Sequence, residues 1–217
     1  MGSHLWWYVA RAAGLTAWVL LALSTAAGVA TATRVLGRRV PSGWLLATHR
    51  FLGGLAVTFV GVHVVGLVAD SWVHLGPLDV LVPLASGWRP VAVAWGVVAA
   101  WLLAAVELTS LVRGRLPVQV WRWVHLASYV LFVSSTLHLF SAGTDTYGLV
   151  IRSVVVLLTG VVALLTIAAA LAVTGRDEPP VATVAPESAP GSAHWRDRPP
   201  TRPPYADLAS RARTPSA

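Results

Sequence analysis

The chain has 217 residues, of which 56% are hydrophobic and only 12% are charged, about half the charged fraction of an average soluble domain. It has no cysteine, which excludes disulfides, cysteine-ligated iron–sulfur clusters and thioether-linked cofactors. The formal charge of +7 comes entirely from arginine, and the arginines are too dispersed to form a nucleic-acid-binding patch.

Five apolar segments are long enough to cross a bilayer, whose hydrocarbon core of about 30 Å takes about 20 residues of helix. They are rich in Leu, Val and Ala and lack the alternation expected of a membrane β-barrel. The sequence therefore predicts an all-α integral membrane protein with a five-helix transmembrane bundle, over residues 7–30, 44–68, 91–112, 118–140 and 149–173.

The first segment has a second interpretation. Arg11, the apolar run and the small-residue sequence "TATR" together resemble a secretory signal peptide. The apolar run is long for such a peptide, and "RVLGRR" follows it as a stop-transfer pattern would. We therefore expect a membrane-spanning helix here.

The connections between the segments differ in charge. "TRVLGRRVPSG" and "RGRLP" are short and basic, whereas the other two connections hold acidic residues and at most one arginine. The positive-inside rule makes the basic connections cytoplasmic, so the N-terminus lies outside and the C-terminus is cytoplasmic. Arg11, near the outer end of the first segment, is the exception to this assignment.

Residues 175–217 have a different composition, with nine of the fourteen prolines and no apolar periodicity. Such a segment cannot bury enough surface to offset the entropy of ordering, so we expect a disordered, Pro-rich cytoplasmic tail. It has no glycine-rich nucleotide fingerprint and is too short for a flavin or nicotinamide domain. We therefore expect this chain to bind neither cofactor.

Four histidines lie inside the predicted spans. His49 and His63 are fourteen residues apart in the second span, and His125 and His138 are thirteen apart in the fourth. The two spans run parallel, and fourteen residues of helix rise about 21 Å. If the spans are neighbours, the histidines pair at two depths, His49 with His125 near the cytoplasmic face and His63 with His138 near the outer face.

Histidines paired in this way can serve as axial ligands of haem iron, because imidazoles from two helices can bind the metal from both faces. Two levels predict two b-type haems with bis-His ligation and no open iron position, which favours electron transfer. A proton path or a zinc site would want acidic partners at one depth, and Glu107 is the single acidic residue in a span. The alternative is a haem-free membrane scaffold or a proton-coupled transporter with helix-bridging histidines.

The two spacings correspond to different angles around the helix axis. At about 100° per residue, fourteen residues return to within about 40° of the starting face, whereas thirteen leave the second histidine about 140° away. Two explanations stay open: the fourth span is distorted, for which "VSST" is a candidate position, or the outer haem is displaced sideways from the inner one.

Neighbouring residues suggest supporting roles. Gly53 and Gly54 can let a macrocycle approach the backbone, although ordinary helix packing also uses glycine. Arg50 and Arg122 flank the inner level and can pair with haem propionates, or extend to the membrane interface without touching haem. Arg152 is a similar candidate at the outer level.

The histidine pattern resembles that of the ferric reductase-like transmembrane domain family. The asymmetric spacing carries the resemblance, together with "THRFLGGL" around His49 and "VWRWVHLASYVLFVSSTLHLF" around the second pair. The resemblance covers the membrane part, which we take as residues 1–174. It implies that haem is held between His49 and His125 and between His63 and His138.

The resemblance also implies a function. Relatives include ferric reductases, NADPH oxidases and the haem-binding membrane subunit of a bacterial methionine-sulfoxide reductase system. A chain of this kind is expected in the bacterial plasma (inner) membrane as a multi-pass oxidoreductase component with no catalytic residue of its own. Its partners would be a cytosolic flavoprotein or membrane quinol as donor, and ferric iron or a partner oxidoreductase outside as acceptor.

Overall fold

A computed structural model describes residues 4–33, 40–71, 75–144 and 148–174 of the protein. The chain divides into two units, Met1–Gly175 and Arg176–Ala217. The tail predicted to be disordered lies outside the described residues, so that prediction is untested. Everything below concerns the first unit.

The described part of the first unit is helical and contains no strand. Five helical stretches are long and apolar enough to cross a membrane, which confirms the predicted class and the number of spans. The fourth of these stretches consists of two helices. The elements are α1 (Leu5–Thr33), α2 (Ser42–Ala69), α3 (Pro77–Leu81), α4 (Pro90–Leu111), the 3₁₀ turn η1 (Arg113–Arg115), α5 (Val118–Leu126), α6 (Ser128–Ala142) and α7 (Leu149–Thr174).

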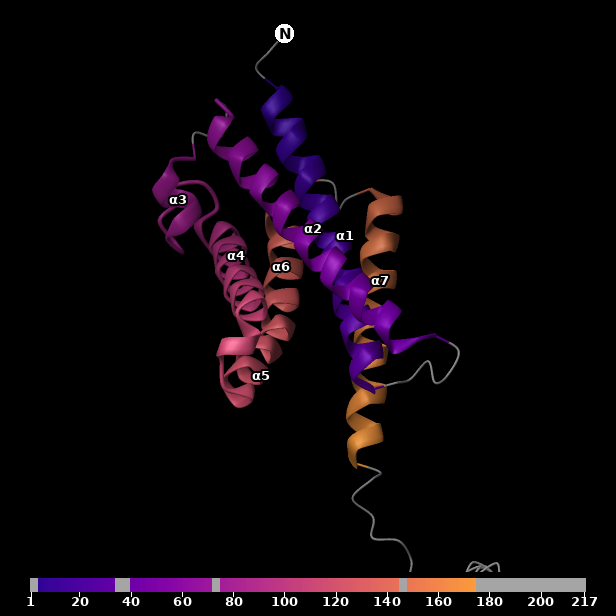
Figure 1. Cartoon of the computed structure of the whole chain (residues 1–217). Helices are drawn as coiled ribbons and strands as arrows, with labels where there is room; N and C mark the ends of the chain where they lie inside the picture. Colours follow the sequence, from indigo (N-terminus) through magenta and orange to yellow (C-terminus); the bar gives the residue numbers. More distant parts are fainter. Residues whose placement is uncertain (1–3, 34–39, 72–74, 145–147, 175–217) are drawn as a thin grey trace, which may run out of the picture. The chain divides into compact units, whose positions relative to one another are not determined.

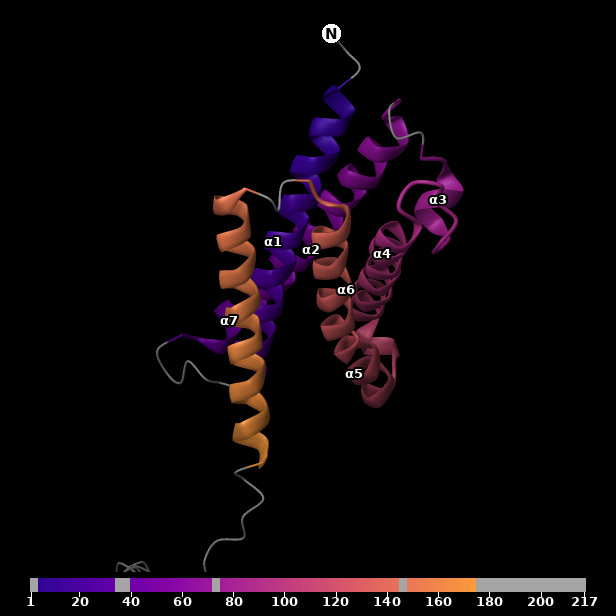
Figure 2. The same cartoon turned by 180° about the vertical axis from the view of Figure 1, so that it is seen from behind.

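The helices pack chiefly as two antiparallel pairs (Figures 1 and 2). The first pair is α1 with α2, and α7 packs against α1; the second is α4 with α6. Small residues let α1 and α2 approach closely: a Cβ added at Gly66 would lie 3.1 Å from that of Ala10. Close backbone approach through small residues is a common basis of helix association in membranes, where hydrophobic burial drives little.

Proline marks the start of four helices. Pro41 and Pro117 precede the first residues of α2 and α5, and Pro77 and Pro90 are the first residues of α3 and α4. Proline suits a helix start because the first amide groups have no partner within the helix and its backbone angle is already helical. The connections therefore end abruptly and the long apolar stretches begin at defined residues.

The fourth span is distorted at Ala127, between α5 and α6. The amide of Ala127 donates to the carbonyl of Trp123 at 3.3 Å and to that of Val124 at 3.1 Å, and the second bond is of the 3₁₀ type. Overwound turns add about 120° per residue in place of about 100°. The added rotation reduces the mismatch that thirteen residues create between His125 and His138.

The suggested position of the distortion, around "VSST", is wrong. Ser135 and Thr136 lie within the regular helix α6, and both hydroxyls donate to the carbonyl of Phe132 in the same helix. Hydroxyl groups bonded back to their own helix are compatible with continuing it.

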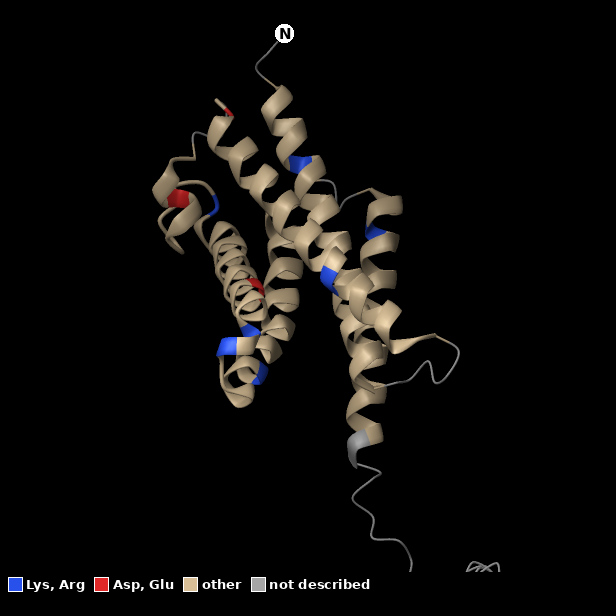
Figure 3. Cartoon of the chain, viewed as in Figure 1, with Lys and Arg blue, Asp and Glu red and all other residues tan. Residues whose placement is uncertain are grey.

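Figure 1 shows α3 at one end of the unit. Long-range hydrogen bonds hold this end together. The Trp101 indole donates to the carbonyl of Leu81 at 2.9 Å, which ties α3 to α4. Arg89 donates to the carbonyl of Ser141 at 2.9 Å, which ties the start of α4 to the end of α6. Charged residues are sparse along the long helices, and arginines gather at the opposite end, where α4, η1 and α5 meet (Figure 3).

Candidate functional site

The four histidines of the spans meet in pairs. The ring centres of His63 on α2 and His138 on α6 lie 6.3 Å apart, with the rings inclined by 77°. Those of His49 on α2 and His125 on α5 lie 5.8 Å apart, inclined by 76°. The structure therefore brings together the partners expected from the sequence, at two positions that are fourteen residues apart along α2, or about 21 Å.

Three of the four rings are oriented by a backbone carbonyl of a neighbouring helix. Nδ1 of His63 lies 2.7 Å from the carbonyl of Ala10, and Nδ1 of His138 lies 2.7 Å from that of Ala92. Nδ1 of His49 lies 2.9 Å from the carbonyl of Ser24. A carbonyl only accepts, so Nδ1 carries the proton in each ring and Nε2 keeps a lone pair for a metal.

A glycine four residues after each of these carbonyls makes room for the ring. A Cβ added at Gly14 would lie 2.8 Å from Nδ1 of His63, and one at Gly96 would lie 2.7 Å from Cε1 of His138. One added at Gly28 would lie 3.1 Å from Cε1 of His49. We call each such carbonyl and glycine a histidine seat: Ala10 with Gly14, Ser24 with Gly28, and Ala92 with Gly96.

These seats were not predicted, although the sequence contains a pattern that could have revealed two of them. Gly14 and Gly28 are fourteen residues apart on α1, the same spacing as His63 and His49 on the antiparallel helix α2. Equal spacing on two adjacent helices keeps each glycine level with one histidine. The seat at Gly96 belongs to a different helix pair and has no such counterpart in spacing.

The spacing of the rings fits a metal bound between them. Bonds of about 2.0–2.1 Å from imidazole nitrogen to a transition metal, plus roughly 1.1 Å from each nitrogen to its ring centre, give a separation near 6.3 Å. The His63–His138 pair has this separation and the His49–His125 pair is slightly closer. Among the described residues, no three His, Cys, Asp or Glu side chains gather as a metal site. Two imidazoles per level therefore suit a metal whose other ligands come from a macrocycle.

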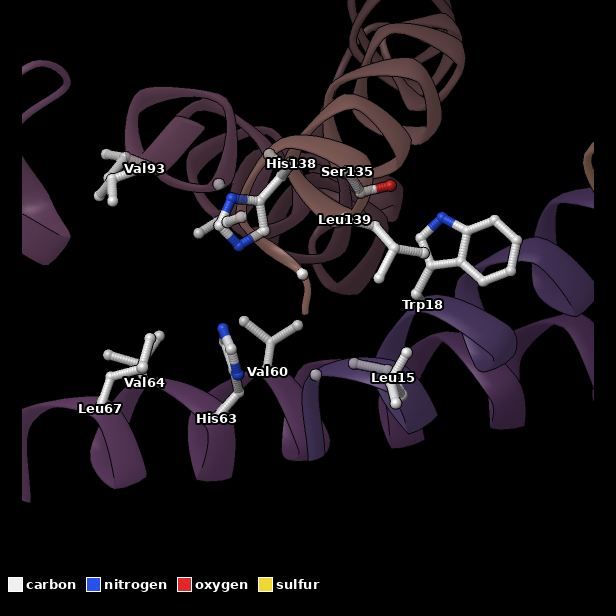
Figure 4. A pocket seen from close by; sticks show the side chains of 18 of the residues that line it. Leu15, Trp18, Val60, His63, Val64, Leu67, Val93, Ser135, His138 and Leu139 are labelled. Carbon is white, nitrogen blue, oxygen red and sulfur yellow. The ribbon is translucent and has the colours of Figure 1, made fainter. Parts of the chain in front are cut away.

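A cavity opens between the helix pairs at the His63–His138 level. The two rings face each other across it, each with a nitrogen turned toward the other ring (Figure 4). The cavity has a volume of about 190 Å³, measured as the space open to the centre of a water-sized sphere. On the same measure, one water molecule needs about 10–15 Å³. The walls are mostly apolar and come from α1, α2, α4 and α6, so the cavity suits a large apolar group.

Arg11 on α1 is a cation in the lining of this cavity. It is half-buried, and its guanidinium lies 5.8 Å from the centre of the Trp7 ring. The sequence interpretation treated Arg11 as an exception to the topology rule, whereas the structure places it in the lining of the cavity at His63 and His138. Arg152, the cation considered for this level, is exposed on α7.

The other residues predicted for the site have varied surroundings. Gly53 is buried, and a Cβ there would lie 2.6 Å from Oε1 of Glu107, so Gly53 accommodates a carboxylate of α4. Gly54 is exposed, and a Cβ there would have nothing within 4 Å. Arg50 and Arg122 are both exposed, at the level of His49 and His125 along their helices.

The fold and these paired histidines define a multi-pass membrane protein with two potential metal positions at different depths. A sequence model of the family described as "Ferric reductase like transmembrane component" matches residues 11–136, more than half of the chain. The chain therefore belongs to this family, whose transmembrane domains generally bind haem, and is a membrane electron-transfer component. No curated protein and no solved structure matches the chain at a significant level.

Proposed function

We propose that the protein is a transmembrane di-haem b-type cytochrome, in which His49 and His125 would hold an inner haem and His63 and His138 would hold an outer haem. The observation that carries the proposal is the pairing of four intramembrane histidines at two depths, with ring centres 5.8 and 6.3 Å apart. Intramembrane ionisable groups are costly and are usually functional.

Haem held between such imidazoles would supply one-electron transfer. The chain's own groups prepare the ligands for this role. The carbonyls of Ala10, Ser24 and Ala92 hold the Nδ1 proton of three rings and leave Nε2 for the metal. Such bonds fix ring orientation and raise the basicity of the ligand. The mostly apolar lining of the outer cavity suits the apolar edge of a macrocycle.

The haem propionates need cationic partners. Arg11 lines the cavity of the outer pair and is suited to this role there. At the inner level the candidates are Arg50 and Arg122, because both flank the inner histidines in sequence and an extended arginine can reach along an apolar surface. Gly53 packs against Glu107, whereas Gly54 is exposed.

The basic connections place the inner pair near the cytoplasm, with the N-terminus outside and the Pro-rich tail at residues 175–217 inside. Electrons then pass outward across the bacterial plasma membrane. The donor is a cytosolic flavoprotein or membrane quinol, and the acceptor is ferric iron or a partner oxidoreductase on the outside. Family membership supports redox partners of this kind without naming them.

The alternative is a haem-free scaffold or transporter in which histidines bridge helices. The three bonds from Nδ1 to carbonyls of other helices do bridge helices, as that alternative requires. It gives no reason for the remaining nitrogens of His63 and His138 to face each other across a cavity (Figure 4). The di-haem proposal accounts for both nitrogens of His63 and of His138.

An absorption spectrum of the purified protein tests the proposal. We expect the bands of a six-coordinate b-type cytochrome and two haems per chain after expression with haem supply. A colourless protein with pH-dependent transport would overturn the proposal in favour of the alternative. Vesicles that contain the protein and an external ferric chelate, supplied with quinol or with a reduced flavoprotein, then identify the class of donor.

A further inference from the structure

His125 differs from the other three histidines in what surrounds Nδ1. This nitrogen is buried and has no hydrogen-bond partner among the described residues. The other three rings each have a backbone carbonyl within 2.9 Å. Buried polar groups without partners are uncommon, and each calls for an explanation.

The sequence of α4 explains why His125 has no seat of the same kind. His125 and His138 are thirteen residues apart, so equal spacing would place the seat of His125 at Thr109, thirteen residues after Gly96, and the next residue is Ser110. Neither residue is a glycine. The hydroxyl of Ser110 is also buried without a partner among the described residues, so it does not replace the missing carbonyl.

An aromatic stack supports His125 in place of the seat. The ring of Trp121 lies 5.0 Å from that of His125 with an inclination of 27°, one helical turn earlier on α5. The guanidinium of Arg113, from η1, lies 4.2 Å from the centre of the Trp121 ring. A cation at this distance from an indole is attracted by the ring, which restricts where the indole can move.

We propose that Trp121, held by Arg113, is the positioning residue for His125 at the inner haem. This inference rests on the proposed function. At the three seats a backbone carbonyl sets the orientation of the imidazole and makes it a stronger electron donor. At His125 side-chain stacking sets the orientation, and no acceptor in the described residues strengthens the ligand. The affinity and midpoint potential of the inner haem therefore depend on an aromatic side chain, which a substitution can remove.

The test compares two tryptophans of α5 in the full-length, haem-loaded protein. Trp123 is 74% exposed and lies two residues from Trp121, so Trp123→Leu is the matched control. Trp121→Leu should weaken inner-haem binding about tenfold or more, the usual cost of losing a group that orients a metal ligand. It should also shift the midpoint potential and low-spin EPR signal of that haem. Trp121→Phe, which keeps a stacking ring, should retain the affinity.

His49→Leu identifies the inner haem as the signal that this substitution removes, and the outer haem of each variant reports whether the chain has folded. If Trp121→Leu prevents folding, Arg113→Gln carries the test and should shift the inner potential alone. Wild-type affinity, potential and EPR signal of the inner haem in Trp121→Leu, or in Arg113→Gln where that is used, would overturn the inference. An equal effect of Trp123→Leu would do the same.

The two proposals fail in distinguishable ways. A wild-type protein that binds no haem contradicts the proposed function and, with it, the role of Trp121. A wild-type protein with two haems, whose inner haem is indifferent to Trp121 and Arg113, contradicts only the positioning role.

Discussion

The two histidine pairs have similar ring separations and inclinations but are supported by different means. Both rings of the outer pair, His63 and His138, rest on a carbonyl and a glycine of a neighbouring helix. In the inner pair only His49 does, and His125 stacks on Trp121. The orientation of both outer imidazoles thus depends on backbone carbonyls and on the space that glycines leave. In the inner pair, the orientation of His125 depends instead on the side chain of Trp121.

This difference determines which substitutions should weaken haem binding at each level. A carbonyl in the middle of a helix cannot be removed by substitution, so the outer level can be damaged chiefly by adding atoms at its glycines. The inner level can also be damaged by removing atoms from its aromatic support. The predictions below test this contrast, from the largest expected effect to the smallest.

Removing a ligand should have the largest effect. His63→Leu or His138→Leu should abolish the outer haem, and His49→Leu or His125→Leu the inner one, because a bis-His site cannot be completed by one imidazole. Haem content, measured as the pyridine haemochrome, should fall by half in each variant. Variants of one pair should lose the same spectral component, and loss of different components would show that the pairs are assigned wrongly.

Adding a methyl group at a seat should have the next largest effect. Gly14→Ala and Gly96→Ala place a Cβ within 2.8 Å of His63 and His138, so the ring must move away from its carbonyl. Outer-haem affinity should fall about tenfold. Gly28→Ala, where the nearest ring atom is 3.1 Å away, should cost the inner haem less.

Gly61→Ala is the control for these variants, because nothing lies within 4 Å of its Cβ position. Alanine favours a helix by about 1 kcal/mol over glycine, so reduced helix propensity cannot explain a loss of haem. Haem titration of the apoprotein followed by absorbance measures the affinities. Equal affinities in Gly14→Ala and Gly61→Ala would contradict the role of the seat.

Replacing the cation of the outer cavity should change the potential more than the affinity. Arg11→Gln removes a positive charge near His63 and His138. The loss of this charge favours ferric over ferrous haem. The outer midpoint potential should fall by up to about 59 mV, equivalent to a tenfold change in a one-electron equilibrium. Redox titration with Arg152→Gln as control measures the shift, and a fall confined to the inner haem would contradict the placement of Arg11.

Removing the hydroxyl of Ser24 should have the smallest effect. This hydroxyl lies 3.1 Å from Nδ1 of His49 and donates to the His49 carbonyl at 3.2 Å, but Ser24→Ala keeps the carbonyl that orients the ring. We expect a loss of about 1 kcal/mol in inner-haem affinity, or about fivefold. The control is Thr25→Ala, whose hydroxyl bonds to Leu21 within α1. A loss as large as that of Gly14→Ala would show that the hydroxyl, and not the carbonyl, is the main support.

Much of the architecture could be predicted because the bilayer imposes it. The need for about 20 apolar residues per span locates all five spans in the sequence, and the helical rise places the histidines at two depths. The distortion of the fourth span followed from the thirteen-residue spacing as one of two explanations. Its position at Ala127 did not, because hydroxyl groups in "VSST" can bond to their own helix and leave it regular.

The surroundings of the site were less predictable, because they depend on which helices touch. Gly53 and Gly54 were singled out for lying near His49 in sequence, yet Gly53 faces Glu107, and the glycines that receive histidine rings lie on α1 and α4. Arg11 was read as a topology residue because the histidines that line the same cavity, His63 and His138, are on other helices. Contacts between elements distant in sequence leave no mark in local composition.

The sequence by itself determined the membrane class, the spans and the depths of four histidines, since these follow from hydropathy and the rise of a helix. Only the tertiary structure decided how each ring is held, because a seat consists of a carbonyl and a missing side chain on a different helix. For the same reason the sequence does not show how His125 differs from the other three histidines. Its stacking on Trp121, and the lack of a partner for Nδ1 among the described residues, are features of the tertiary structure.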